Sequence, residues 1–237
     1  MAVGAVDATG VEVVDLETTS VRELNQRLHD LAKAPGPRRW RIVNPSGAHA
    51  LAVGLDAEVE VEIEGHVGYY CAGMNKRATV RVHGNASTGI AENLMSGRVE
   101  VDGNVSQSAG ATGRGGLVVV RGNASSRCGI SMKGIDIVVG GDVGHMSAFM
   151  AQRGCLVVCG DAGEALGDSI YEARLYVRGA VASLGADCVE KELREEHVSQ
   201  LAALLGAAGI EADPTEFRRY GSARRLYNFE IDNAGAY

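Results

Sequence analysis

The sequence lacks the marks of several large classes of protein. It has no apolar run long enough to form a transmembrane helix. Its N-terminus, MAVGAVDATG, has no basic start followed by an apolar core, so we expect no secretory signal and a cytoplasmic location. Lys and Arg number 23 against 30 Asp and Glu, which gives a formal charge of −7. This balance argues against a dedicated nucleic-acid binder, because neutralising phosphates requires clustered cations.

Cysteine is scarce, and its spacing fits neither disulfides nor a metal cluster. The five residues are an odd number without a CxxC pair: Cys71, Cys128, Cys155, Cys159 and Cys188. Cys155 and Cys159 would lie roughly 13 Å apart along one extended strand, which is too far for a shared metal. We therefore predict free thiols in a reducing compartment.

Motifs of catalysis are also missing. The sequence has no GxSxG, no Walker motif, no HExxH and no GxGxxG placed after a strand. His66, His83 and His145 have no acid at a spacing that specifies a catalytic triad. We predict that this chain contains no catalytic residue, no bound cofactor and no metal site.

What the sequence does contain is a repeat of nineteen residues, marked by seven glycines: Gly65, Gly84, Gly103, Gly122, Gly141, Gly160 and Gly179. Four and two residues before each glycine stands a Val, Ile or Leu, and two residues after it a Val or Ala. This alternation predicts a short strand with one buried face and one solvent-exposed face.

Two further columns of the repeat describe its corners. The position seven residues after the glycine holds only Ala or Gly, which indicates a tight corner or a close approach of stacked backbones. The position directly after the glycine is mostly Asn or Asp, for example Asn85, Asn104 and Asp142. These residues tolerate left-handed backbone and favour a stacked corner ladder.

The repeat predicts an all-β solenoid, a β-helix of about seven coils. One copy cannot bury its apolar face alone, whereas stacked copies bury it against one another. The rival solenoid is the left-handed hexapeptide β-helix, and nineteen is not a multiple of its six-residue unit.

The flanking segments are expected to be helical. Ser20–Lys33 has an S-x-x-E capping box and an apolar stripe, and Trp40–Val43 predicts a short strand, whereas residues 1 to 19 show no strong periodicity. Val189–Ala208 predicts a second helix, followed by a basic and aromatic tail. We expect three parts: an N-terminal helix and entry cap (1–58), the β-helix (59–189), and a C-terminal helix with a partner-binding tail (190–237).

A column of cations runs eleven or twelve residues after the corner glycines: Lys76, Arg77, Arg114, Lys133 and Arg153. Such a column is either a solvated corner or a strip that docks an acidic surface of another subunit. It is the candidate partner interface of the chain.

The corners carry a family resemblance. Short segments of one type recur at 84–87 (GNAS), 103–106 (GNVS), 122–125 (GNAS), 141–144 (GDVG) and 160–163 (GDAG). This series resembles the GXGXG domain that ends the large subunit of glutamate synthase, over about residues 39–190. The resemblance implies a right-handed β-helix.

The resemblance is to that final domain alone, as in the free-standing GXGXG subunit of N-methylglutamate synthase and related complexes. Ala2 stands where a class II amidotransferase has its cysteine nucleophile, and neither an FMN barrel nor cluster cysteines are present. The resemblance therefore implies a non-catalytic scaffold subunit of a cytoplasmic hetero-oligomer. Its partners would be a class II glutamine amidotransferase-like subunit and an FMN-binding synthase-like subunit, with FMN and an iron–sulfur cluster in a partner. Glutamine or glutamate and 2-oxoglutarate are the implied substrates.

Two other functions stay open. One is the C-type subunit of a formylmethanofuran dehydrogenase-like complex, a more distant relative with the same β-helix. The other is an independent β-helix enzyme acting on a saccharide, which requires paired carboxylates in one groove. Glu92, Asp168 and Asp187 share a column, but residues 92 and 168 are four coils apart, roughly 19 Å, which argues against the enzyme.

Overall fold

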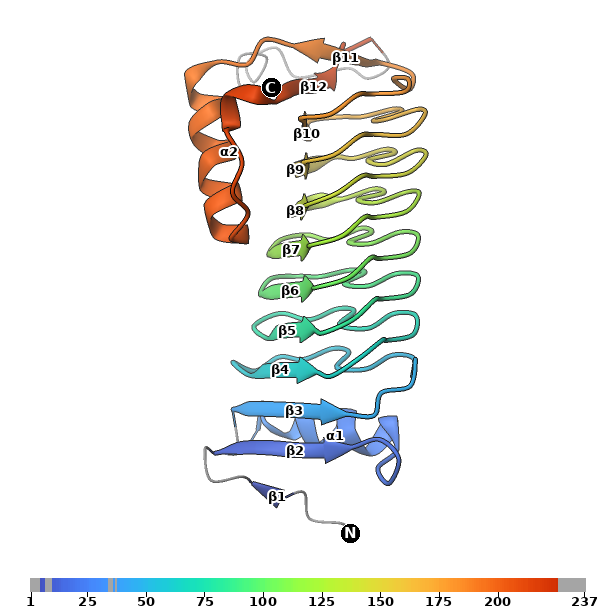
Figure 1. The fold of residues 1–237 in the computed structure, drawn as a ribbon, viewed down its shortest axis with the longest axis vertical. Coiled ribbons are helices and arrows are strands. Elements are labelled where there is room, and N and C mark those ends of the chain that lie inside the picture. Colours follow the sequence, from blue (N-terminus) through green and yellow to red (C-terminus); the bar gives the residue numbers. More distant parts are fainter. Residues whose placement is uncertain (1–4, 7–9, 34–35, 37, 226–237) are drawn as a thin grey trace.

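A computed structural model describes residues 5–6, 10–33, 36 and 38–225. Short strands stack one above another into a β-solenoid, with one helix near each end (Figure 1). The helices are α1 (Val21–Asp30) and α2 (Glu195–Ala208), with a short 3-10 helix η1 (Pro214–Glu216). The strands are β1 (Ala5–Val6), β2 (Val11–Asp15), β3 (Arg39–Val43), β4 (Glu60–Ile63), β5 (Thr79–Val82), β6 (Arg98–Val101), β7 (Leu117–Val120), β8 (Lys133–Val139), β9 (Arg153–Val158), β10 (Arg174–Val177), β11 (Cys188–Lys191) and β12 (Arg218–Ser222).

The predicted β-helix of about seven coils is confirmed, and its register is the repeat itself. Strands β4 to β10 pair in parallel so that residues nineteen apart lie side by side, as in Val61↔Val80 and Val80↔Val99. A second parallel ladder joins the positions two residues after the glycines, from Val67↔Ala86 to Ala162↔Val181. The aliphatic side chains of both ladders point into one continuous buried core. Stacking therefore supplies the burial that a single coil lacks.

The small-residue column lies at a tight corner, as its composition predicts, and in six of its seven copies the backbone there is left-handed. Ala72, Ala91 and Ala148 have φ values of 55°, 57° and 58° and are fully buried. A Cβ atom added at Gly110, in the same column, would lie 2.6 Å from Ile137 Cδ1. Both the positive φ and the lack of space restrict this position to Gly and Ala.

The predicted Asn and Asp corner ladder is also confirmed, but the expected left-handed backbone is wrong, because Asn85, Asn104, Asn123, Asp142 and Asp161 do not have positive φ values. The backbone N–H of Asn104 donates to Asn85 Oδ1 at 2.7 Å, and the same bond repeats from Asn123 to Asn104 at 2.8 Å. The ladder continues through Asp142 and Asp161 to the N–H of Ala180. Each side chain thus satisfies a backbone donor of the next coil, which explains why acceptor side chains recur at this position.

The N-terminal end of the solenoid is closed by α1, and the predicted helix and its Ser20 cap are confirmed. Ser20 Oγ accepts the N–H of Glu23 at 3.2 Å, and Leu24 and Leu28 are buried against the first coil. Asn25 Oδ1 accepts the N–H of Ala52 at 2.9 Å, a donor that has no earlier coil to bind. The helix therefore caps both the apolar core and the backbone.

The parallel ladder begins earlier than the nineteen-residue repeat. β3 pairs with β4, and β2 pairs with β3 from Val11↔Arg39 to Asp15↔Val43. The expected strand at Trp40–Val43 is therefore confirmed, whereas β2 falls in a segment for which no element was expected. No helix among the described residues is long and apolar enough to cross a bilayer.

The C-terminal end differs from the predicted helix Val189–Ala208. Its first residues form strand β11, and α2 begins only at Glu195. β12, from the basic tail, pairs antiparallel with both β10 and β11. β11 therefore joins the sheet through β12. Tyr220 of β12 is buried in the main core at the end of the stack. Residues 226–237 of the tail lie outside the described residues.

The outer face of the sheet changes character along the stack, and α2 covers its apolar half (Figure 1). The position three residues before the glycine is Glu62, Arg81 and Glu100 in β4 to β6. In β7 to β10 it becomes Val119, Val138, Val157 and Tyr176, which pack with Leu201 and Leu205 of α2 and with Phe217. The expectation of a uniformly wet face is wrong for these four coils, because a second core lies beneath α2.

Candidate functional site

The five cations of the predicted interface fall into two groups. Lys76 Nζ lies 2.7 Å from Asp56 Oδ2, and Arg77 Nε lies 3.3 Å from Asp56 Oδ1. The hydrogen bond from Lys76 holds the pKa of Asp56 below its ordinary value, so the acid stays ionised. These two cations are therefore partly neutralised within the chain.

Arg114, Lys133 and Arg153 form the second group, which we call the cationic column. Lys133 stands one coil beyond Arg114, and Arg153 is its register partner in the β8–β9 pair. All three are exposed. Within the part of the chain that the structure describes, no carboxylate lies within ion-pair distance of them. Met95, 40% exposed, occupies the coil between Lys76 and Arg114 and separates the two groups.

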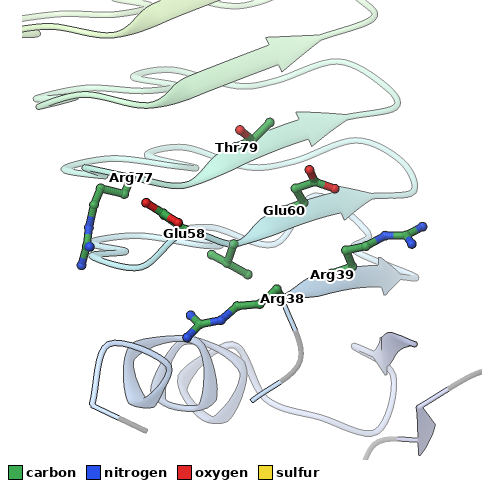
Figure 2. A pocket seen from close by; sticks show the side chains of 7 residues that line it. Arg38, Arg39, Glu58, Glu60, Arg77 and Thr79 are labelled. Carbon is green, nitrogen blue, oxygen red and sulfur yellow. The ribbon is translucent and has the colours of Figure 1, made fainter. Parts of the chain in front are cut away.

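An open groove lies at the N-terminal end of β3, β4 and β5 (Figure 2). Its volume is about 340 Å³, and it is lined by Arg38, Arg39, Glu58, Val59, Glu60, Arg77 and Thr79. The side chains of Arg38 and Arg39 point in opposite directions (Figure 2). Arg77 donates to the backbone carbonyl of Asp56 at 2.7 Å. The charged groups therefore do not converge on one point, as a reaction centre requires.

One set of side chains on the outer face has the composition of a metal site. Ligand atoms of Glu62, Glu64 and His83 all lie within 4.8 Å of one another. His83 Nδ1 is 2.8 Å from Asp102, whereas Arg81 and Arg41 lie 3.8 Å from Glu62 and Glu64. Because two arginines compete for the carboxylates, this set is part of a charge ladder, a series of acidic and basic side chains that pair across neighbouring strands.

That ladder ends on a buried carboxylate that the sequence did not reveal. Glu100 is 3% exposed and binds Arg98, Arg81 at 3.3 Å and Arg121 at 3.4 Å. Burial opposes ionisation of Glu100, but the hydrogen bonds from Arg98 and Arg81 outweigh it and hold its pKa below the ordinary value. Arg121 also donates to the carbonyl of Gly209, the C-cap of α2, at 2.9 Å. Glu100 therefore links the charged half of the face to the covering helix.

Four further polar side chains with catalytic potential form structural hydrogen bonds. His66 Nδ1 accepts the N–H of Asn85, and His197 Nδ1 accepts the N–H of Arg194 at the start of α2. Asp168 accepts the N–H of Ala186. Asp187 accepts the hydroxyl of Ser222 at 2.6 Å. Asp168 and Asp187 lie one repeat apart, on adjacent coils, but both carboxylates already accept structural hydrogen bonds, so they give little support to a paired-carboxylate saccharide enzyme.

The five cysteines are free, as predicted, and the structure shows that all five are buried. Burial raises the pKa of Cys71, Cys128, Cys155 and Cys188 to about 12. Buried thiols that stay protonated are poor nucleophiles and poor metal ligands, so these residues serve as core side chains.

The seven corner glycines lie where stacked coils come closest. A Cβ atom at Gly84, Gly103, Gly122, Gly141, Gly160 or Gly179 would approach the preceding coil to less than 3.0 Å, and Gly65 has a φ of 136°. They position the coils and line no cavity among those described.

These features define a capped β-solenoid that presents charged surfaces, with no catalytic constellation among its described residues. No profile of a known protein family matches the sequence. The chain is 65% identical over 226 residues to Protein GlxC of Rhizobium meliloti (strain 1021), which covers 95% of this chain and 99% of that protein. The chain therefore belongs to the GlxC family.

Proposed function

We propose that this chain is the non-catalytic scaffold subunit of a glutamate-synthase-like complex, and specifically of an N-methylglutamate synthase or a related amino-group-transferring assembly. An amidotransferase-like partner releases the amino group, and an FMN and iron–sulfur partner uses it. The solenoid braces the two so that the nitrogen passes between their sites.

The observation that carries this proposal is the cationic column. Its three exposed cations stand on successive coils, and no carboxylate of the described residues lies within ion-pair distance of them, whereas Lys76 and Arg77 already share Asp56. Aligned charge of one sign on a rigid ladder suits the steering and orientation of a partner protein. The resemblance of the corners to the GXGXG domain is the reason for proposing a complex of the glutamate synthase class.

The test is purification of the chain alone and in a mixture with the amidotransferase-like and FMN-binding subunits of the same organism. We expect the isolated chain to show no flavin absorbance and no glutaminase activity, and to elute in one complex with the other two subunits. A yellow isolated chain, or one that elutes separately from both subunits, would overturn the proposal.

A further inference from the structure

The cationic column has a regular spacing set by the backbone. The backbone N–H of Lys133 donates to Gly113 O, and that of Gln152 donates to Met132 O, so successive coils are in direct contact here. Neighbouring strands lie about 4.8 Å apart, which places Arg114, Lys133 and Arg153 at intervals of that size along the solenoid axis.

An apolar strip runs beside the column. Ile130 and Phe149 are half-buried, and they occupy equivalent positions on adjacent coils, joined by the hydrogen bond from Ser131 N–H to Phe149 O. Met150 is 44% exposed, although large apolar side chains are mostly buried in this protein. Ile130 precedes Lys133 by three residues, and Met150 precedes Arg153 by the same number. An exposed Met and half-buried Ile and Phe side chains close in sequence to cations have the composition of a binding surface.

The backbone of this surface cannot accept an added strand. The N–H groups of Arg114, Lys133 and Arg153 already donate to carbonyls of the preceding coil. β-Augmentation requires free main-chain donors and acceptors at a sheet edge. A partner must therefore be recognised through its side chains.

A helix that lies along the solenoid axis can place its side chains at the same intervals as the three cations of the column. Residues three or four apart on one helix face are separated by about 4.5 to 6 Å along its axis. Acidic residues at such intervals would each face one cation, and an adjacent apolar stripe would cover Ile130, Phe149 and Met150. Because the chain as a whole carries −7, an acidic helix is repelled by most of its surface and attracted here.

We infer that the cationic column and the apolar strip together bind an acidic amphipathic helix of a partner subunit. This inference rests on the proposed function, which supplies the complex to which the partner belongs. It identifies the docking element by its chemistry: carboxylates at helical spacing on one side and aliphatic or aromatic side chains on the other.

The experiment measures the affinity of each partner subunit for two variants of equal charge. In the first, Arg114, Lys133 and Arg153 are changed to Glu; in the control, the exposed cations Arg22, Lys33 and Arg39, which lie outside the candidate interface, are changed to Glu. At low salt we expect the first to bind one partner about 100-fold more weakly and the control to bind within about 3-fold of wild type. Met150→Ser removes the apolar contact without adding charge, and it is expected to weaken the same partner about 10-fold at both low and high salt.

Zero-length carbodiimide cross-linking of Lys133 then identifies the segment of the partner that it touches. We expect a carboxylate within an acidic helix whose amides gain protection from hydrogen exchange on binding. If wild type binds and the first variant binds equally well, or if the cross-link lies in an extended or basic segment, the inference is wrong while the scaffold role stands. If wild type binds neither subunit, both proposals fail.

Discussion

Gly122→Ala is expected to destabilise the protein by about 3 kcal/mol, an unusually large effect for one added methyl group. The new Cβ atom would lie 2.5 Å from Asn104 Oδ1, 2.8 Å from Gly103 O and 3.0 Å from Gly103 C. Two of these atoms belong to the backbone of the preceding coil, which cannot move without breaking the hydrogen bond from Gly122 N–H to Gly103 O. The clash therefore opens the corner ladder between two coils.

Gly206→Ala is the matched control, because it adds the same atom at an exposed helical position with nothing within 4 Å. It is expected to stabilise α2 by about 0.5 kcal/mol, since Ala is the better helix former. Urea denaturation followed by circular dichroism compares both variants with wild type. Equal midpoints for Gly122→Ala and wild type would show that the coils are not in close contact at this corner.

Glu100→Gln is expected to cost about 2 kcal/mol at neutral pH, in the range of hydrogen bonds to charged groups. The amide keeps one acceptor oxygen but places an NH2 group among three arginines. Arg121 loses the carboxylate that orients it toward Gly209 O, so α2 should lose protection from hydrogen exchange before the coils do.

The pH dependence provides a second readout of the same residue. Because the folded-state pKa of Glu100 is depressed, its contribution is present above the unfolded-state pKa, ordinarily 4.5, and is lost as pH falls through the folded-state value. The stability difference between wild type and Glu100→Gln should therefore be largest at neutral pH. It should shrink as the pH falls below 4.5 and vanish below the folded-state pKa of Glu100. Glu60→Gln, at an exposed position at the start of β4, is the control and should change stability little at neutral pH. A difference for Glu100→Gln that is equal at neutral and acidic pH would contradict this explanation.

The repeat made the solenoid predictable because residues at the same position of successive repeats contact each other in the structure. Val61 and Val80 are nineteen residues apart and pair side by side, so one period fixed the strands and their register together. The Ala and Gly column predicted a tight corner for the same reason, because only small residues fit there, whereas the left-handed backbone expected at the Asn and Asp positions lies instead in this column.

The ends of the chain were harder to predict because their partners are distant in sequence. β11 contains Glu190 and Lys191, which suit a helix, and it becomes a strand because β12 pairs with it from about thirty residues away. Val11–Asp15 is short and acquires its structure from β3. The sequence did contain the signal for the site of α2, namely the change from Glu100 to Val119, Val138 and Val157 in one column.

The candidate interface was predictable as a column but not as two groups. Nineteen-residue spacing aligned Lys76 with Arg114 and Lys133, whereas the neutralising position of Asp56 depends on how the first coils are joined. The apolar neighbours Ile130, Phe149 and Met150 became visible only when their exposure was known.

The central claim is that the solenoid contributes no reacting group and acts by holding two enzymes together. Its most direct test is the rate of glutamine-dependent amino-group transfer by the two partner subunits, measured with and without this chain. We expect the glutaminase and flavin half-reactions to persist without the chain and the coupled reaction to fall to the rate supported by free ammonia. A coupled rate that is the same in its absence would contradict the scaffold function.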